Sequence, residues 1–137
     1  MKPVALVIGG SGAIGASISG RLCANGYEVW TTSRTATGSR TIALDADSPA
    51  TYANVTTVPP CSAVVWAQGI NSNDSIVDVD IDVMRRVVDV NTTLVIATMH
   101  ELVASGRLLD GAKLCVISSV WQQVTRRNKL SDRKSVV

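Results

Sequence analysis

The stretch that decides the fold is VIGGSGAIG, residues 7–15, which has glycines at positions 9, 12 and 15. The continuous apolar run VALVI (4–8) leads into it, and a segment with apolar residues at helical spacing follows it. Glycines at such a turn let the backbone approach a pyrophosphate with no Cβ in the way, and the N–H groups at the helix start favour the anion. The sequence therefore predicts a strand, a phosphate-binding loop and a helix. The alternative is a tight turn with a purely structural role.

Short apolar runs and longer helical patterns continue to alternate along the chain. A helix is predicted at 13–26, strands at 27–32, 41–45 and 62–69, a long helix at about 80–105, and a fifth strand at 112–119. Pro49 fits the first turn of a short helix. Strands that alternate with crossover helices form a parallel sheet. We therefore predict an α/β domain of order β-α-β-β-α-β-α-β, a doubly wound parallel sheet that is incomplete at its C-terminal end.

Bulk composition limits the function classes. The 137 residues are 46% hydrophobic, and the formal net charge is only +2, so we expect neither a nucleic-acid partner nor a membrane partner. The three cysteines are far apart and have no Cys-x-x-Cys spacing, which indicates neither a zinc site nor a disulfide framework. No apolar run approaches the ~18 residues of a membrane span. We expect a cytoplasmic protein without a metal site.

Four motifs in order carry a family resemblance: GGSGAIG (9–15), WAQG (66–69), VN before TT (90–93) and VISS (116–119). Together they resemble the short-chain dehydrogenase/reductase family over residues 4 to about 131. The family loop reads T-G-x-x-x-G-x-G, so Ile8 replaces the threonine and Ala13 the middle glycine. The resemblance implies a Rossmann-type NAD(P)-binding domain. The positions that it assigns to cofactor binding are Gly9, Ser11, Gly12, Ile14, Gly15, Ser33, Arg34, Asp45, Ala67, Gln68 and Gly69.

The end of the second predicted strand bears on the choice of dinucleotide. An acidic residue there would bind the ribose hydroxyls of NAD and repel a 2′-phosphate. This chain has Ser33 and then Arg34, and a guanidinium can grip a phosphate by two hydrogen bonds. We therefore expect NADP(H) in preference to NAD(H). The alternative is that Arg34 is an ordinary solvated charge.

Two further positions concern the adenosine half of the cofactor. Asp45 follows the third predicted strand, where family members use a carboxylate to accept from the adenine amino group; the alternative is a helix-capping aspartate. WAQG stands where the family has N-N-A-G, so Trp66 and Ala67 replace both asparagines and Gln68 replaces the alanine. Gly69 still permits close approach to the adenosine ribose.

The resemblance assigns catalytic roles to Asn91 and Ser119. The family places an asparagine in the long helix, where its main chain helps to hold a proton-relay water. Its serine beyond the fifth strand hydrogen-bonds the substrate carbonyl, which orients and polarises the substrate but supplies no proton. The alternatives are a solvated helix asparagine and a turn serine.

The family's Tyr-x-x-x-Lys is expected at 132, where this chain has Asp132, with Val136 in place of the lysine. We expect residues 1–131 to be a partial NAD(P)-binding domain and 132–137 to be a non-native or disordered tail. One reading frame of a common sequencing-adapter DNA encodes Asp-Arg-Lys-Ser-Val-Val, so adapter read-through is our preferred explanation. A truncated paralogue with a polar tail is the alternative.

We also expect the long-helix face with Leu94, Val95, Leu102 and Val103 to lack a cover.

The resemblance implies that the parent protein is an NADP(H)-dependent oxidoreductase, a homo-oligomer that interconverts a small-molecule carbonyl and an alcohol. We expect the chain as printed to be inactive, because the tyrosine and lysine are missing. A non-catalytic NADP(H)-binding sensor or regulator is the first alternative. A methyltransferase is the second, although such enzymes usually need an acid where Arg34 stands.

Overall fold

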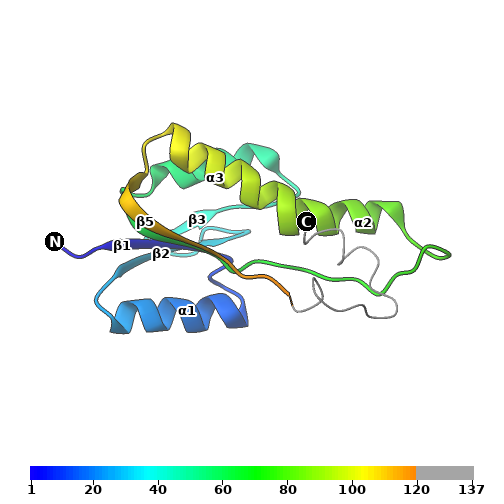
Figure 1. Ribbon diagram of the computed structural model, residues 1–137, viewed down its shortest axis with the longest axis horizontal. Coiled ribbons are helices and arrows are strands. Elements are labelled where there is room, and N and C mark those ends of the chain that lie inside the picture. Colours follow the sequence, from blue (N-terminus) through cyan, green and yellow to red (C-terminus); the bar gives the residue numbers. More distant parts are fainter. Residues whose placement is uncertain (120–137) are drawn as a thin grey trace.

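The computed structural model describes residues 1–119 and shows one parallel sheet with helices on both faces (Figure 1). Its strands run in the spatial order β3-β2-β1-β4-β5. They are β1 (Val4–Ile8), β2 (Glu28–Ser33), β3 (Thr41–Ala43), β4 (Cys61–Trp66) and β5 (Leu108–Val116). The predicted Rossmann-type α/β fold and its order of elements are confirmed.

Helix α1 (Ala13–Ala24) covers one face of the sheet, and the 3₁₀ helix η1 (Pro49–Thr57) and α3 (Leu94–Ala104) cover the other (Figure 1). The predicted helix stop is confirmed, since Gly26 follows α1 with a φ of +87°. Pro49 opens η1 as predicted. The helices on opposite faces bury both sides of β1, so its residues from Ala5 to Ile8 are no more than 1% exposed. Burial on both faces explains the unbroken apolar run in the sequence.

The predicted bounds of the fourth and fifth strands were shifted. β4 ends at Trp66, because the residues after it leave the sheet at its carboxyl edge. β5 runs from Leu108 to Val116, so it begins four residues before the predicted start at 112 and includes Asp110 and Gly111. The pairing register shifts there, and Gly111 absorbs the irregularity with a φ of +75°. A glycine inside a strand is typical of such a bulge.

The long helix is continuous over Ile81–Ala104 but has three parts. They are α2 (Ile81–Val88), the π-helical turn η2 (Asp89–Thr93) and α3. Asp80 caps its N-terminus by accepting from the N–H groups of Asp82 and Val83. By length and hydropathy the helix could also cross a membrane, although a core helix of a globular domain meets the same criterion.

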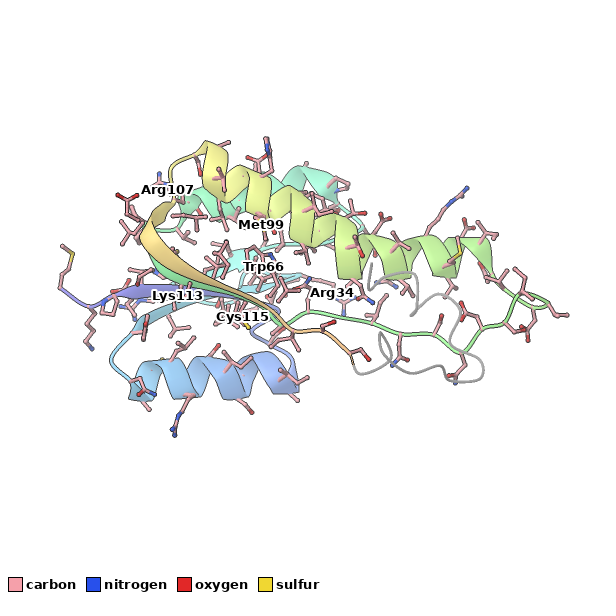
Figure 2. All side chains as sticks on the ribbon, viewed as in Figure 1. Arg34, Trp66, Met99, Arg107, Lys113 and Cys115 are labelled. Carbon is pink, nitrogen blue, oxygen red and sulfur yellow. The ribbon has the colours of Figure 1, made fainter. Side chains whose placement is uncertain are left out.

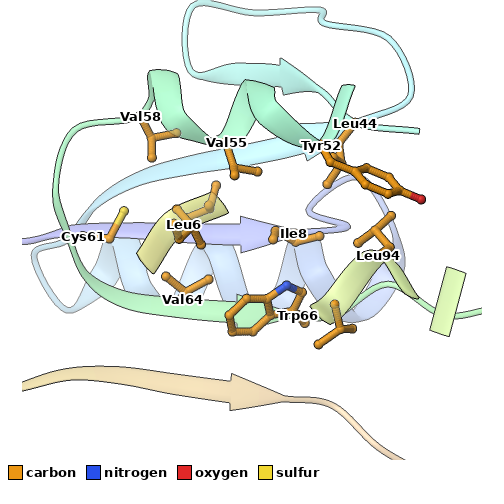
Figure 3. Close-up of a cluster of buried hydrophobic side chains, with 12 residues drawn as sticks. Leu6, Ile8, Leu44, Tyr52, Val55, Val58, Cys61, Val64, Trp66 and Leu94 are labelled. Atoms are coloured by element: carbon orange, nitrogen blue, oxygen red, sulfur yellow. The ribbon is translucent and has the colours of Figure 1, made fainter. Parts of the chain in front are cut away.

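The expectation of an uncovered face on the long helix was wrong for Leu94, Val95 and Leu102. All three are buried, and Leu94 packs in one cluster with Ile8, Trp66 and Tyr52 (Figure 3). The side chains at 94, 95, 98 and 102 point to the sheet and to η1, which supplies the cover that the prediction lacked. Val103 is 62% exposed, and Ile96, two helical turns earlier on the same helix, is 64% exposed.

A buried polar contact fixes the helix against the sheet. The indole N–H of Trp66 donates to the Oγ1 of Thr98 at 2.9 Å, and both side chains are fully buried. The Thr98 hydroxyl donates in turn to the carbonyl of Leu94 at 2.7 Å. Because buried polar groups are costly when they lack partners, this chain favours a single register of α3 on β4.

The predictions for the end of the chain lie outside the described residues. They concern the boundary between 1–131 and 132–137, and the positions Asp132 and Val136. They stay predictions.

The contact between the glycine loop and α1 leads to a first testable prediction. A Cβ on Gly15 would lie 2.1 Å from the carbonyl oxygen of Gly9, so backbone would have to move, whereas a Cβ on Gly20 of the same helix would meet nothing within 4 Å. Gly15→Ala should therefore lower the free energy of unfolding by about 2 kcal/mol or more. Gly20→Ala should raise it by about 0.5–1 kcal/mol. Urea unfolding followed by circular dichroism measures both, and equal stability of the two variants would contradict the packing described.

Candidate functional site

A cavity of about 340 Å³ opens at the carboxyl edge of the sheet. This size falls within the range of small-molecule sites, and the edge is where doubly wound sheets bind ligands. Its walls come from the β1–α1 loop, the ends of β2, β3 and β4, and one side of the long helix. The predicted residues that line it are Gly9, Ser11, Gly12, Ser33, Arg34, Asp45, Ala67, Gln68 and Gly69.

The glycine loop is held between the ends of β2 and β4, the strands on either side of β1. Gly9 has a φ of +80°, and a Cβ there would lie 2.7 Å from the backbone nitrogen of Gln68. The N–H of Gly9 donates to the Oγ1 of Thr32 at 3.0 Å, which joins the loop to the end of β2. Thr32 is only 2% exposed and lines the cavity. The sequence analysis did not identify it, because a threonine inside a strand is typical of strands in general.

Gly12 differs from its neighbours in what surrounds it. It stands at the N-cap of α1, lines the cavity, and would place a Cβ at an ordinary 3.6 Å from the carbonyl oxygen of Gly9. The protein alone would therefore accept a side chain there, and the glycine leaves that volume to a ligand. A phosphate group suits the place, since it would meet the free N–H groups at the start of α1. The two other predicted loop residues do not line the cavity: Ile14 is 55% exposed on α1 and Gly15 packs against Gly9.

The wall beyond β3 is a rigid turn. The N–H of Asp45 donates to the Oγ1 of Thr51 at 2.9 Å, and its Oδ1 accepts from the N–H of Asp47 at 3.0 Å. The N-cap residue of η1 is Ser48, so the alternative that Asp45 caps this helix was wrong. Apolar side chains of Leu44 and Leu94 complete the walls around this end of the cavity.

Several carboxylates surround this end of the cavity. Burial raises the pKa of the Tyr52 hydroxyl, and the negative charges of Asp89, Asp45 and Asp47 raise that pKa further. The same hydroxyl donates to the carbonyl of Ala46 at 3.4 Å. Tyr52 therefore stays neutral at ordinary pH and acts as a buried support for the turn.

The end of β2 presents the predicted serine and arginine side by side. The Ser33 hydroxyl donates to the carbonyl of Thr35, and Arg34 is exposed at the carboxyl end of the sheet (Figure 2). Within residues 1–119 no carboxylate forms an ion pair with Arg34. Its guanidinium is thus available to an anionic ligand at the rim of the cavity.

Asn91 lies in the π-helical turn, and its side chain holds the loop after β4 by two hydrogen bonds. Its Oδ1 accepts from the N–H of Ile70 at 2.9 Å, and its Nδ2 donates to the carbonyl of Ile70 at 2.8 Å. The Nε2 of Gln68 donates to the carbonyl of Val90 at 3.2 Å. A π-helical turn in a long helix often marks a functional site, because it shifts the local backbone bonding. Asn91 itself does not line the cavity.

Ser119 is half-buried and lies three residues past the end of β5. The chain is still next to β4 just before it, since the N–H of Ile117 donates to the carbonyl of Trp66 at 2.9 Å. Ser119 is outside the cavity lining, although it follows a strand whose carboxyl end faces the same edge of the sheet.

Arg86 is a charged residue of the cavity wall that the sequence analysis missed. It lies on α2, lines the cavity, and forms an ion pair with Asp47, with Nη2 and Oδ2 3.2 Å apart. The signal available in the sequence is its spacing of four from Val90 and of eight from Leu94, which puts the three on one face of a helix. Without the position of the turn after β3, that face could not be assigned to a ligand site.

The family model described as "NAD dependent epimerase/dehydratase family" matches residues 5–119. No curated protein sequence matches the chain.

Solved structures of short-chain dehydrogenases are similar over nearly the whole chain. A short chain dehydrogenase family protein from Francisella tularensis subsp. tularensis SCHU S4 has a TM-score of 0.86 at 22% identity, over 98% of this chain and 58% of that one. An actinorhodin polyketide ketoreductase variant with NADPH has a TM-score of 0.88 at 21% identity, over 98% and 59%. A short-chain dehydrogenase/reductase from Serratia marcescens BCRC 10948 has a TM-score of 0.85 at 24% identity, over 98% and 66%. At these identities the likeness shows the fold, and the chain spans about three fifths of the length of these structures.

The two hydrogen bonds between Asn91 and Ile70 lead to a second prediction. Asn91→Ala removes both hydrogen bonds to Ile70, so the amide hydrogen of Ile70 should exchange with solvent about tenfold faster or more, because a hydrogen bond is worth about 1 kcal/mol or somewhat above. Hydrogen exchange followed by NMR measures this rate. Asn25→Ala is the control, since the side chain of Asn25 donates to the carbonyl of Arg21 at the end of α1, away from Ile70. An unchanged exchange rate of the Ile70 amide hydrogen in Asn91→Ala would show that the side chain of Asn91 does not hold this loop.

Proposed function

The chain belongs to the NAD dependent epimerase/dehydratase family, and from that premise we propose that it is the dinucleotide-binding part of an NADP(H)-dependent short-chain oxidoreductase. The reaction proposed is the interconversion of a carbonyl and an alcohol. The observation that carries the choice of cofactor is Arg34, an exposed guanidinium at the rim of the cavity, next to Ser33 and without a carboxylate partner in the described chain. An NAD-binding site would place an acid there.

The residues around the cavity fit a dinucleotide along its length. The N–H groups at the start of α1 and the open side of Gly12 suit the pyrophosphate. Ser33 and Arg34 suit a 2′-phosphate. Asp45 lines the cavity and holds one oxygen on the N–H of Asp47, so its second oxygen suits the amino group of an adenine. Gly69 lines the cavity next to this end and suits the ribose.

The proposed chemistry divides between the cofactor and the chain. When bound, the dinucleotide gives hydride to a carbonyl carbon or takes it from an alcohol. We assign to Ser119 the hydrogen bond that polarises the substrate carbonyl, and to the main chain at Asn91 the holding of a relay water. The side chain of Asn91 serves the loop at Ile70. This division leaves only main-chain groups of the π-helical turn for the water.

Neither tyrosine of the chain is placed to donate a proton in this reaction. Its two tyrosines are Tyr27 and Tyr52. Tyr27 comes just before β2, at the amino edge of the sheet, and Tyr52 is buried with its hydroxyl on the carbonyl of Ala46. We therefore propose that the 137-residue chain binds NADP(H) and does not turn over.

A sensor or regulator that binds NADP(H) is the second candidate function. It is favoured by the contrast between the binding residues, most of which line one cavity, and the catalytic pair Asn91 and Ser119, which both lie outside its lining.

The choice of cofactor leads to a third prediction. Arg34→Gln removes the charge-assisted bonds to a 2′-phosphate, each worth about 1.5–3 kcal/mol, so the Kd for NADPH should rise by about tenfold or more. The Kd for NADH should stay the same within about twofold, because that ligand has no 2′-phosphate. Isothermal titration calorimetry with both dinucleotides measures this.

Arg40→Gln is the control for charge, since Arg40 is an exposed arginine whose partner is Glu28, at the opposite end of β2 from Arg34, at 3.7 Å, and which does not line the cavity. If Arg34→Gln raised the Kd for NADPH and the Kd for NADH by the same factor, the contact between Arg34 and the 2′-phosphate would be contradicted. Equal increases in the Kd for NADPH in Arg34→Gln and Arg40→Gln would show a general effect of charge in place of a contact between Arg34 and the 2′-phosphate.

The missing proton donor leads to a fourth prediction. The purified 137-residue chain should bind NADPH and yet leave NADPH absorbance unchanged when simple ketones are added, because Ser119 alone supplies no proton. Ketone-dependent oxidation of NADPH that is lost in Ser119→Ala would overturn the proposal that this chain does not turn over. The same result would exclude the second candidate function, a non-catalytic sensor or regulator that binds NADP(H).

A further inference from the structure

We propose that Arg86 and Asp47 form a clasp across the base-binding end of the cavity, and that the guanidinium of Arg86 contacts the adenine ring of the dinucleotide. The inference rests on the proposed function, since it concerns the same cavity. It makes Arg86 a specificity-determining residue for the base, in addition to the residues predicted from the sequence.

The first argument is the position of the ion pair. Arg86 projects from α2 and Asp47 from the turn after β3, and Nη2 and Oδ2 are 3.2 Å apart. Both elements contribute residues to the walls of the cavity, although Asp47 itself is not among the lining residues. One wall carries Arg86, Val90 and Leu94 on a single helix face, and the other carries the segment 44–46. The ion pair therefore runs from wall to wall.

The second argument is the rigidity of the Asp47 end. The N–H of Asp47 donates to Asp45 at 3.0 Å, and the N–H of Ser48 donates to the carbonyl of Asp45, also at 3.0 Å. The Tyr52 hydroxyl donates to the carbonyl of Ala46 at 3.4 Å. These bonds fix the backbone that carries Asp47, so its carboxylate offers Arg86 a limited set of positions, and less side-chain freedom is lost when a ligand binds.

The third argument is the chemistry of the two walls. Their other side chains at this end are largely aliphatic: Leu44, Ala46, Val90 and Leu94. Such walls suit the faces of a flat base. A guanidinium is planar, weakly hydrated and stacks on aromatic rings. With Asp47 balancing its charge, Arg86 is suited to a neutral ring more than to a phosphate.

A purely structural role for the pair is the alternative. The side chains of Arg86 and Asp47 are 49% and 56% exposed, and ion pairs that are this exposed add little to folding stability. Loss of the pair should thus leave the melting temperature almost unchanged. An effect on ligand affinity without an effect on melting is the signature of the clasp.

The chain offers a matched control next to Arg86. Arg85 lies on the same helix, is 71% exposed, pairs with Asp82 at 3.4 Å, and does not line the cavity. Arg85→Met and Arg86→Met remove the same charge from adjacent positions. Any long-range effect of charge on an anionic ligand should therefore be nearly the same in both variants.

The experiment is calorimetric titration of the full chain and its variants with NADPH, NADH and reduced nicotinamide mononucleotide, which has no adenine. Arg86→Met should raise the Kd for NADPH and for NADH by the same factor, about three- to tenfold, as expected for a cation on an aromatic face. It should not change the affinity for the mononucleotide. Arg85→Met should behave as the unaltered chain, and both variants should melt as it does.

Asp47→Asn completes the test as a double-mutant cycle. It should weaken NADH binding in the unaltered chain more than in Arg86→Met, because only the former has a clasp to lose, whereas its direct charge effect is present in both.

The other outcomes have distinct meanings. Equal affinities of Arg86→Met and Arg85→Met for NADH would overturn the clasp and leave the proposed function standing. A loss for NADPH alone would also overturn it, because Arg86 would then bind the 2′-phosphate. Failure of the unaltered chain to bind either dinucleotide would overturn the proposed function, and the clasp with it.

Discussion

The closeness of two glycines at the end of β1 is the constraint on which the site depends. A Cβ on Gly15 would come within 2.1 Å of the carbonyl oxygen of Gly9, and a Cβ on Gly9 within 2.7 Å of the backbone of Gln68. The absence of both atoms lets the loop press against its own helix on one side and against the end of β4 on the other. The start of α1 is thereby brought to the carboxyl edge of the sheet, where its N–H groups face the cavity.

The same loop couples the binding half of the site to the long helix. Gln68, which packs on Gly9, donates to the carbonyl of Val90, and Asn91 holds Ile70 from the next position along the helix. The π-helical turn that contains both Val90 and Asn91 thus receives two contacts from the segment after β4. A ligand that displaces this segment would act directly on the turn. Binding and the proposed relay position are therefore joined through hydrogen bonds of adjacent residues.

What the sequence predicted and what it did not can be separated by the range of the interactions. VALVI and the glycine loop were identified because each pattern is local: a strand buried on both faces, followed by a turn that needs glycine. The burial of Leu94 and Leu102 was misjudged, since η1, nearly forty residues earlier in the chain, covers them. Arg86 was missed for the same reason, because its partner Asp47 is distant in sequence. Periodicity shows which face a residue takes, and only tertiary contact shows what lies opposite.

The substitution of Trp66 for a family asparagine changes how the cavity achieves selectivity. The indole turns away from the cavity into the core, where it binds Thr98 and fixes the long helix on the sheet. One polar side chain of the family pattern is thus exchanged for stability of the wall that bears Val90 and Leu94. Backbone groups and aliphatic side chains then form most of the lining, and neither distinguishes strongly between one dinucleotide and another. In the proposed dinucleotide site, discrimination between NADP(H) and NAD(H) would therefore fall to Arg34 at the rim, because a charged contact is strong enough to separate ligands that differ by a single phosphate.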